Sequence, residues 1–214
     1  MVTMVALLDL LMPPACAACG RVGALLCPRC LNGLQVPSRP ADRFLAPDGG
    51  VVVGDALFLA MAAFAYEGPM RRALAALKYG GASRLAPILA RAATPAFGNL
   101  LAITGPAVLV PVPLHRERQR ARGYNQAELI ARQLGTPMAL ALERVRPTTK
   151  QHRLNRAARL ANLRAAFRAS GAVPLTAILV DDIITTTATL EACASVLRQA
   201  GCSAVYGFSL AREV

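Results

Sequence analysis

The fold is decided by one stretch, Ala177-Ile-Leu-Val-Asp-Asp-Ile-Ile-Thr-Thr-Thr-Ala-Thr-Leu190. Its first four residues, Ala177 to Val180, are apolar without alternation, which predicts a short strand buried on both faces of a parallel sheet. Asp181 and Asp182 follow. Because buried carboxylates repel each other and lose their hydration, we expect them where the strand leaves the core. That carboxyl end is where open parallel sheets bind ligands.

A hydroxyl-rich turn, Thr185 to Thr189, comes next, and Leu190 to Ala200 predicts a helix that ends before Gly201. Backbone N–H groups and threonine hydroxyls at the start of a helix favour a phosphate group. An acidic pair beside such a turn indicates a phosphorylated sugar bound with a metal ion. The alternative is a buried strand, an exposed acidic turn and a threonine N-cap that bind nothing.

This stretch resembles the phosphoribosyl pyrophosphate (PRPP) motif of type I phosphoribosyltransferases: four apolar residues, two acids, a short spacer and a Thr-rich turn. The resemblance implies that Asp181 and Asp182 hold the ribose hydroxyls, directly or through Mg²⁺. It also implies that the 5-phosphate is bound by Thr185, Thr186, Thr187, Ala188 and Thr189. Thr187 departs from the family pattern, which usually has glycine there, and a β-branched residue resists the positive φ that glycine permits.

Two pairs of cysteines lie near the N-terminus, Cys16-Ala-Ala-Cys19 and Cys27-Pro-Arg-Cys30. Four thiolates at this spacing can close tetrahedrally on Zn²⁺, which predicts a zinc ribbon, with redox dithiols as the alternative. The ribbon either stabilises a small domain or contacts nucleic acid or a partner. A Pro- and Gly-rich connection from Val36 to Gly50 then predicts two domains, a ribbon at 1–36 and a larger domain at 51–214.

A basic loop follows a second predicted strand at Ala107 to Val112. It reads Leu114-His-Arg-Glu-Arg-Gln-Arg-Ala-Arg-Gly-Tyr-Asn-Gln126. Arginine binds phosphate oxygens through two parallel hydrogen bonds, so Arg116, Arg118 and Arg122 would neutralise a leaving pyrophosphate. The alternative is a solvated basic loop. Further strands and helices are predicted at 57–66, 70–80, 85–93, 127–134, 138–142 and 204–210.

Several motifs resemble the competence protein F (ComF) family, and the resemblance covers nearly the whole chain. They are the cysteine pairs, Lys78-Tyr79-Gly80, Val110-Pro-Val-Pro-Leu-His115 and Arg122-Gly-Tyr-Asn-Gln126. The resemblance implies an α/β fold of the type I phosphoribosyltransferase kind, an open parallel sheet with helices on both faces behind a zinc ribbon. It also likens 144–164 to a loop that closes over PRPP and brings Lys150 or Arg153 to the phosphates, with an exposed Arg-rich helix as the alternative.

The ComF resemblance implies a PRPP-binding protein that acts with single-stranded DNA, and with competence-machinery proteins, in natural transformation. The alternative is a metabolic, Mg²⁺-dependent phosphoribosyltransferase that releases pyrophosphate from PRPP to an unknown acceptor. In that enzyme the catalytic residues would be Asp181, Asp182, Arg116 and Arg122. Enzymatic activity itself stays open, because nothing in the sequence identifies the acceptor.

Composition favours a polyanionic partner, because the formal net charge is +12. Tryptophan is absent and aromatic residues make up 5% of the chain, which weakens a model based on base stacking alone. No segment qualifies as a membrane span, and Met1 to Met12 is too short, so we expect a cytoplasmic protein. Cys193 and Cys202 are expected to be small buried residues.

Overall fold

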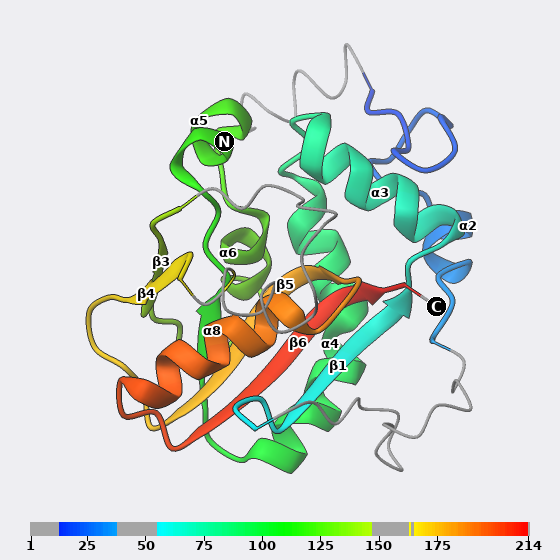
Figure 1. The fold of residues 1–214 in the computed structure, drawn as a ribbon. Helices are drawn as coiled ribbons and strands as arrows, with labels where there is room; N and C mark the ends of the chain where they lie inside the picture. The colour runs from blue at the N-terminus through cyan, green and yellow to red at the C-terminus, as the bar shows by residue number, and fades with distance from the viewer. Residues whose placement is uncertain (1–12, 38–54, 147–162, 164, 214) are drawn as a thin grey trace, which may run out of the picture.

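A four-stranded parallel sheet, in the order β1-β6-β5-β2, forms the centre of the protein (Figure 1). The computed structural model describes residues 13–37, 55–146, 163 and 165–213. All neighbouring strands of this sheet run parallel, so their carboxyl ends meet at one edge. The strands are β1 (Leu59–Ala65), β2 (Val108–Pro111), β5 (Thr176–Ile184) and β6 (Ala204–Arg212).

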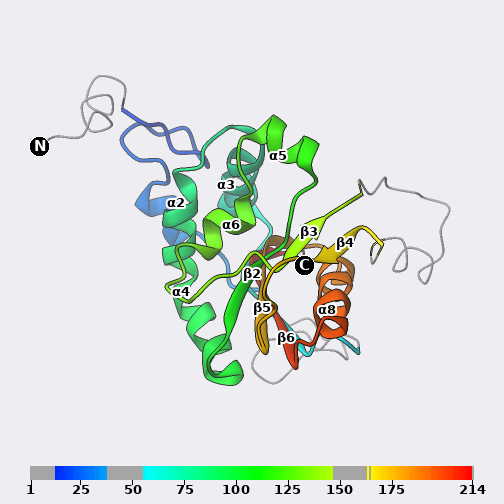
Figure 2. The same ribbon diagram turned by 90° about the vertical axis from the view of Figure 1, so that its left-hand side faces the viewer.

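Helices cover both faces of the sheet, as Figure 2 shows in a view along its edge. Side chains of β5 alternate between two cores: Ile178 and Val180 pack with α3, α4 and α6, whereas Leu179 packs with α8. This confirms the predicted α/β fold and the strand buried on both faces. The helices are α3 (Gly68–Tyr79), α4 (Leu85–Thr104), α6 (Gln126–Ala131) and α8 (Ala188–Gln199).

The strand that carries the two acids is longer than predicted. β5 does not end at Val180 but continues through Ile184, because Ile183 and Ile184 pair with the end of β6. The expectation that the acids mark the exit from the core is therefore wrong, and Asp182 is only 4% exposed. Two β-branched residues after the acids favour continued strand.

The basic segment after β2 is a helix rather than a loop. α5 spans Arg116–Arg122 and ends at Gly123, whose φ of 83° is in the left-handed region. Arg, Gln, Glu and Ala are all good helix formers, which explains why the loop prediction is wrong here. Arg118 and Arg122 lie on one side of the helix, and Arg116 and Arg120 lie on another.

A small antiparallel ribbon stands beside the main sheet and was not predicted. It pairs β3 (Leu142–Arg144) with β4 (Phe167–Ala169). Of the predicted strand at 138–142, Met138 forms an isolated parallel bridge with Leu109 and Leu142 is the first residue of β3. Three-residue strands are too short to show alternation, so the sequence carries little signal for them.

Helix α4 continues through Pro95 to Thr104, beyond the predicted end at Ala93. At this length it is the one helix among the described residues whose size and apolarity match a membrane span, contrary to the expectation of none. The core helices of soluble proteins can have the same length and apolarity. The face of α4 that carries Leu89, Phe97 and Leu100 is buried against the sheet core.

The cysteine-bearing segment packs directly on the larger part of the molecule, beside α3 (Figure 1). Cys16, Leu26 and Cys30 belong to the same apolar cluster as Met70 and Leu74 of α3. Arg72 also donates a hydrogen bond to the carbonyl of Ala18. The short helix α2 (Pro28–Asn32) carries the last cysteine. Residues 38–54, which contain most of the predicted connection, lie outside the described residues.

Candidate functional site

Asp182 is the centre of a buried polar cluster near the carboxyl edge of the sheet. The Nζ atom of Lys78, at the end of α3, lies 3.0 Å from its Oδ2 atom. The side-chain amide of Gln126, the first residue of α6, donates to the same oxygen at 3.0 Å. One carboxylate thus joins β5, α3 and α6, with its charge balanced by an ammonium group.

Asn125 fixes the position of Gln126. Its side-chain oxygen accepts a hydrogen bond from the backbone N–H of Ala127 at 3.0 Å, which caps α6. Its amide nitrogen donates to the carbonyl of Val112, just after β2, also at 3.0 Å. The amide oxygen of Gln126 is buried without a hydrogen-bond partner, although the residue is only 4% exposed. The site therefore presents one acceptor that still lacks a donor.

Asp181 has a different environment from its neighbour. The backbone N–H of Asp182 donates to its Oδ1 atom at 2.8 Å. Burial and the adjacent Asp182 carboxylate raise the pKa of Asp181 to about 8, while the Asp182 N–H and Lys78 oppose that shift. A carboxyl group with this pKa is mostly protonated at neutral pH. Asp181 therefore contributes little negative charge at neutral pH.

On the β3 and α8 side, Asp181 interacts electrostatically with Arg144 and Cys193. Burial lowers the pKa of Arg144, the charge of Arg118 lowers it further, and Asp181 opposes the change. Burial, with Asp181 second, raises the pKa of the Cys193 thiol well above its usual value. Cys193 and Cys202 are both buried, as predicted. Neither thiol is therefore activated as a nucleophile.

Beside the acidic pair, a cleft of about 660 Å³ opens between α3 and α5. Tyr124 fixes the two sides relative to each other, because its hydroxyl donates to the carbonyl of Leu77 at 2.5 Å. Burial raises the pKa of this phenol, although Arg122 opposes the shift. The cleft contains three cations and, among the described residues, no carboxylate lines it. Its lining residues are Lys78, Tyr79, Gly81, Arg118, Ala121 and Arg122.

The other basic residues of α5 lie apart from this cleft. Arg116 and Arg120 line a second hollow with Gln119 and Gly123. His115, the residue before α5, has its Nδ1 atom 3.6 Å from a carboxylate oxygen of Glu117. Of the three arginines predicted to bind pyrophosphate, the structure thus brings Arg118 and Arg122 together at one cleft and places Arg116 at another.

The predicted phosphate turn lies between β5 and α8. Thr185 and Thr186 are exposed, and Thr187 precedes the first residue of α8. The φ of Thr187 is −71°, which any residue adopts, so the backbone here does not require the glycine typical of the family. Threonine at this position is thus free of backbone strain. Lys150 and Arg153, predicted on a closing loop, lie outside the described residues.

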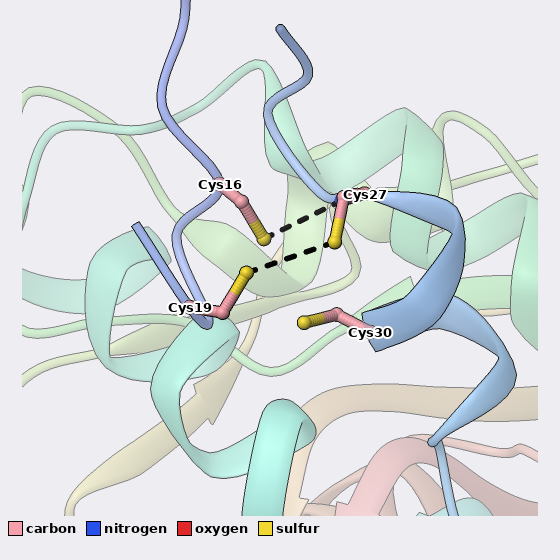
Figure 3. Close-up of side chains that lie close together, drawn as sticks. All are labelled: Cys16, Cys19, Cys27 and Cys30. Atoms are coloured by element: carbon pink, nitrogen blue, oxygen red, sulfur yellow. Dashed lines mark hydrogen bonds between the residues drawn. The ribbon is translucent and has the colours of Figure 1, made fainter. Parts of the chain in front are cut away.

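The four N-terminal cysteines converge on one point, with sulfur atoms within 4.8 Å of one another (Figure 3). Cys19 and Cys27 are 3.7 Å apart at their sulfurs, close to the ~3.8 Å that tetrahedral Zn–S bonds of 2.3 Å require. Burial would raise the pKa of Cys16, but backbone hydrogen bonds, that from Cys27 first, lower it to about 6. The four thiols fit a structural metal ion such as Zn²⁺.

Most of these residues stand out individually in the sequence, but their contacts with one another do not. Lys78 and Gln126 stood out only as parts of family-like motifs, and no local signal indicated that both contact Asp182. Lys78 belongs to the last turn of α3 and Gln126 to the first turn of α6, so their common contact with Asp182 appears only in the folded chain.

These features define an α/β protein with a parallel sheet, a polar site near the sheet's carboxyl edge and a four-cysteine cluster consistent with a zinc ribbon. No family model matches the chain. The chain is 31% identical to the DNA utilization protein YhgH of Salmonella typhimurium over 212 residues, covering 93% of this chain and 89% of that protein.

Two further relatives match about half of the chain. Competence protein F of Haemophilus influenzae is 36% identical over 116 residues, covering 50% of this chain and 51% of that protein. Competence protein ComFC of Bacillus subtilis is 38% identical over 109 residues, covering 50% and 45%. The chain belongs to the ComF family, as its motifs predicted.

Proposed function

We propose that this protein binds PRPP with Mg²⁺ at the carboxyl edge of the sheet and acts with single-stranded DNA in natural transformation. The observation that carries the proposal is the Asp181–Asp182 pair on β5, directly followed by the N-terminus of α8. Acids placed before a helix start suit a sugar that carries both hydroxyl and phosphate groups.

The orphaned oxygen of Gln126 supports a hydroxyl-bearing ligand. It is a buried acceptor without a donor, and leaving such an atom unpaired costs about 1–3 kcal/mol. Asp182 and Gln126 together provide acceptors for vicinal hydroxyl donors, which is the chemistry of a ribose. A ribose hydroxyl pointing at Gln126 would satisfy that oxygen.

The phosphate groups of PRPP fit two positions. The 5-phosphate would bind the N–H groups and hydroxyls of residues 185–189 at the start of α8, a helix long enough for its dipole to act. Glu191, the acid in the first turn, is oriented toward the backbone N–H groups of Ala56 and Leu57. The pyrophosphate would lie in the cleft, near Arg118 and Arg122.

Mg²⁺ is the cation that this ligand implies, and oxygen ligands at the site suit it. Asp181 and Asp182 are the carboxylates that would hold it, directly or through the ribose hydroxyls. When bound, the ion supplies neutralisation of the pyrophosphate charge. The Nζ atom of Lys78 lies 3.0 Å from the Oδ2 atom of Asp182, so a cation of the protein already contacts this carboxylate.

The DNA part of the proposal comes from the relatives. They are named for DNA utilization and for competence, and the basic composition of this chain fits a nucleic acid partner. We propose single-stranded DNA and competence-machinery proteins as its partners. The cytoplasmic location and the boundary between a ribbon at 1–36 and a domain at 51–214 stay predictions.

A metabolic phosphoribosyltransferase is the second candidate, favoured by the cationic cleft that Lys78, Arg118 and Arg122 line beside the acidic pair. Arg116 lies at another hollow, so Arg118 and Arg122 would stabilise the leaving pyrophosphate. Release of pyrophosphate from PRPP in a screen of acceptors would identify this activity.

Isothermal titration of the zinc-loaded protein with PRPP and Mg²⁺ tests the central proposal. We expect saturable binding by the wild type and its loss in the Asp182→Asn variant. Asp55→Asn is the matched control, because Asp55 is exposed and precedes β1. Absence of binding by a folded wild type would overturn the PRPP assignment.

A further inference from the structure

Tyr79 is an aromatic residue with unusual exposure at the mouth of the cationic cleft. It is the last residue of α3 and its relative exposure is 82%. Phe58 is the other strongly exposed aromatic residue of the described chain, at 43%, and it precedes β1 at the opposite, amino edge of the sheet. A single exposed ring is ordinary, but Tyr79 also lines the cleft that contains Lys78, Arg118 and Arg122.

One face of the Tyr79 ring is already supported. The guanidinium carbon of Arg122 lies 5.6 Å from the ring centroid, which is a cation–π contact. Arg122 in turn has a buried Nη1 atom without a hydrogen-bond partner. The Tyr124–Leu77 hydrogen bond fixes this part of the chain to the end of α3. The ring is thus held in place while most of its surface stays open.

The groups around the ring are those that recognise a nucleotide. Lys78, Arg118 and Arg122 line the cleft next to Tyr79, and their positive charge suits phosphate groups. An exposed aromatic face stacks on a nucleobase, whichever base it is. A base in a duplex is already stacked on both sides, so the arrangement favours an unpaired base.

We propose that Tyr79 stacks on an unpaired nucleobase of single-stranded DNA whose phosphates contact Arg118 and Arg122. This inference rests on the proposed function and names the residue that holds the base. Arg118 and Arg122 are about one helical turn apart on α5, a rise of about 6 Å along the helix axis. They can therefore contact phosphates of the DNA strand on the side of the cleft that faces the Tyr79 ring. The DNA phosphates would therefore occupy the position proposed for the pyrophosphate of PRPP, so the strand and PRPP bind this cleft alternately.

A ten-nucleotide single strand with 2-aminopurine at one position tests the proposal, because stacking quenches the fluorescence of this base. We expect the wild type to quench it on binding, and Tyr79→Leu to abolish the quenching and weaken binding about tenfold. Tyr79→Phe should behave like the wild type, since it retains the ring. An oligonucleotide with an abasic site at that position should bind the wild type about as weakly as the intact strand binds Tyr79→Leu.

Phe58→Leu is the matched control. Phe58 also has an arginine over its ring, with the Arg198 guanidinium carbon 5.5 Å from the centroid, but it lies at the far edge of the sheet. Its loss should leave quenching unchanged. Equal quenching by the wild type and Tyr79→Leu, or none by the wild type, would overturn the proposal.

Titration of the same variants with PRPP and Mg²⁺ separates the two proposals. If the wild type binds PRPP but Tyr79→Leu quenches normally, only the stacking role fails. If PRPP does not bind while quenching depends on Tyr79, the PRPP assignment fails and the stacking role is supported.

Discussion

At the scale of single residues, the site depends on two adjacent acids with different roles. Asp182 is buried and paired with Lys78 and Gln126, so its charge is compensated by the protein itself. Burial and the neighbouring Asp182 carboxylate raise the pKa of Asp181 to about 8. Asp182 is therefore paired with a cation of the protein, whereas Asp181 takes up a proton on folding.

The raised pKa of Asp181 predicts a pH-dependent stability. A carboxyl group titrates near pH 3.9 in the unfolded chain, so between about pH 4 and pH 8 the folded state binds the extra proton. Stability from this group is complete below pH 4 and is lost as the pH rises through 8. Asp181→Asn should therefore gain in melting temperature relative to the wild type on going from pH 5 to pH 9.

Thermal melts at both pH values measure this effect, with Asp55→Asn as the exposed control. Parallel shifts of the wild type and Asp181→Asn with pH would contradict an elevated pKa in the folded state.

Glu191 illustrates a buried acid with a structural role. Its two carboxylate oxygens accept from the N–H groups of Ala56 and Leu57, each at 3.2 Å, and fix the start of β1 to α8. Glu191→Leu would leave both donors buried and unpaired, which should lower the free energy of unfolding by about 2–4 kcal/mol. Glu191→Gln retains one acceptor oxygen and should lose about half as much. Urea denaturation measures both values, and a loss below about 1 kcal/mol in Glu191→Leu would speak against this role.

At the scale of elements, the cysteine segment and α3 share one apolar cluster. Metal binding should therefore stabilise more than the segment itself. We expect about one zinc per chain by elemental analysis. Cys16→Ser should lose the metal and melt at a lower temperature, whereas Cys193→Ala should keep it, because Cys193 is buried in α8 on the other face. Full zinc content in Cys16→Ser would contradict the four-cysteine site.

Elements with long or strongly patterned sequences could be predicted, whereas short ones could not. The apolar run in β5 and the Gly68-Pro69 start of α3 have clear local signals. Pro95 suggested a helix end, but packing of α4 on the sheet outweighs the single lost hydrogen bond. The prediction of a loop between β2 and α6 follows from the place of this segment between a strand and a helix, and it is wrong because the Arg, Gln, Glu and Ala residues of the segment favour a helix.

The candidate site was predictable in part for a similar reason. Asp181, Asp182 and the threonine turn are contiguous in sequence, and the four cysteines have a recognisable spacing. The contacts of Asp182 with Lys78 and Gln126 join distant segments, so only the folded chain shows them. The cleft beside Tyr79 is likewise a property of how α3 meets α5.

At the scale of the whole molecule, a net charge of +12 should give salt-dependent binding of single-stranded DNA. Each phosphate neutralised contributes about −0.7 to the slope of log K against log salt for single strands. Arg116→Gln/Arg120→Gln, in the second hollow that α5 lines, should reduce that slope by about 1.4. The control is the double variant Arg91→Gln/Arg132→Gln, at two exposed arginines outside α5. An equal reduction of the salt slope in both double variants would show that DNA binding depends on total charge and not on a defined binding surface.

The most direct test of the account is a crystal structure of the protein with PRPP and Mg²⁺. We expect ribose hydroxyls at Asp182 and Gln126, the 5-phosphate at residues 185–189, and pyrophosphate near Arg118 and Arg122. A structure with PRPP bound elsewhere, or with this edge empty at saturating ligand, would contradict the central claim.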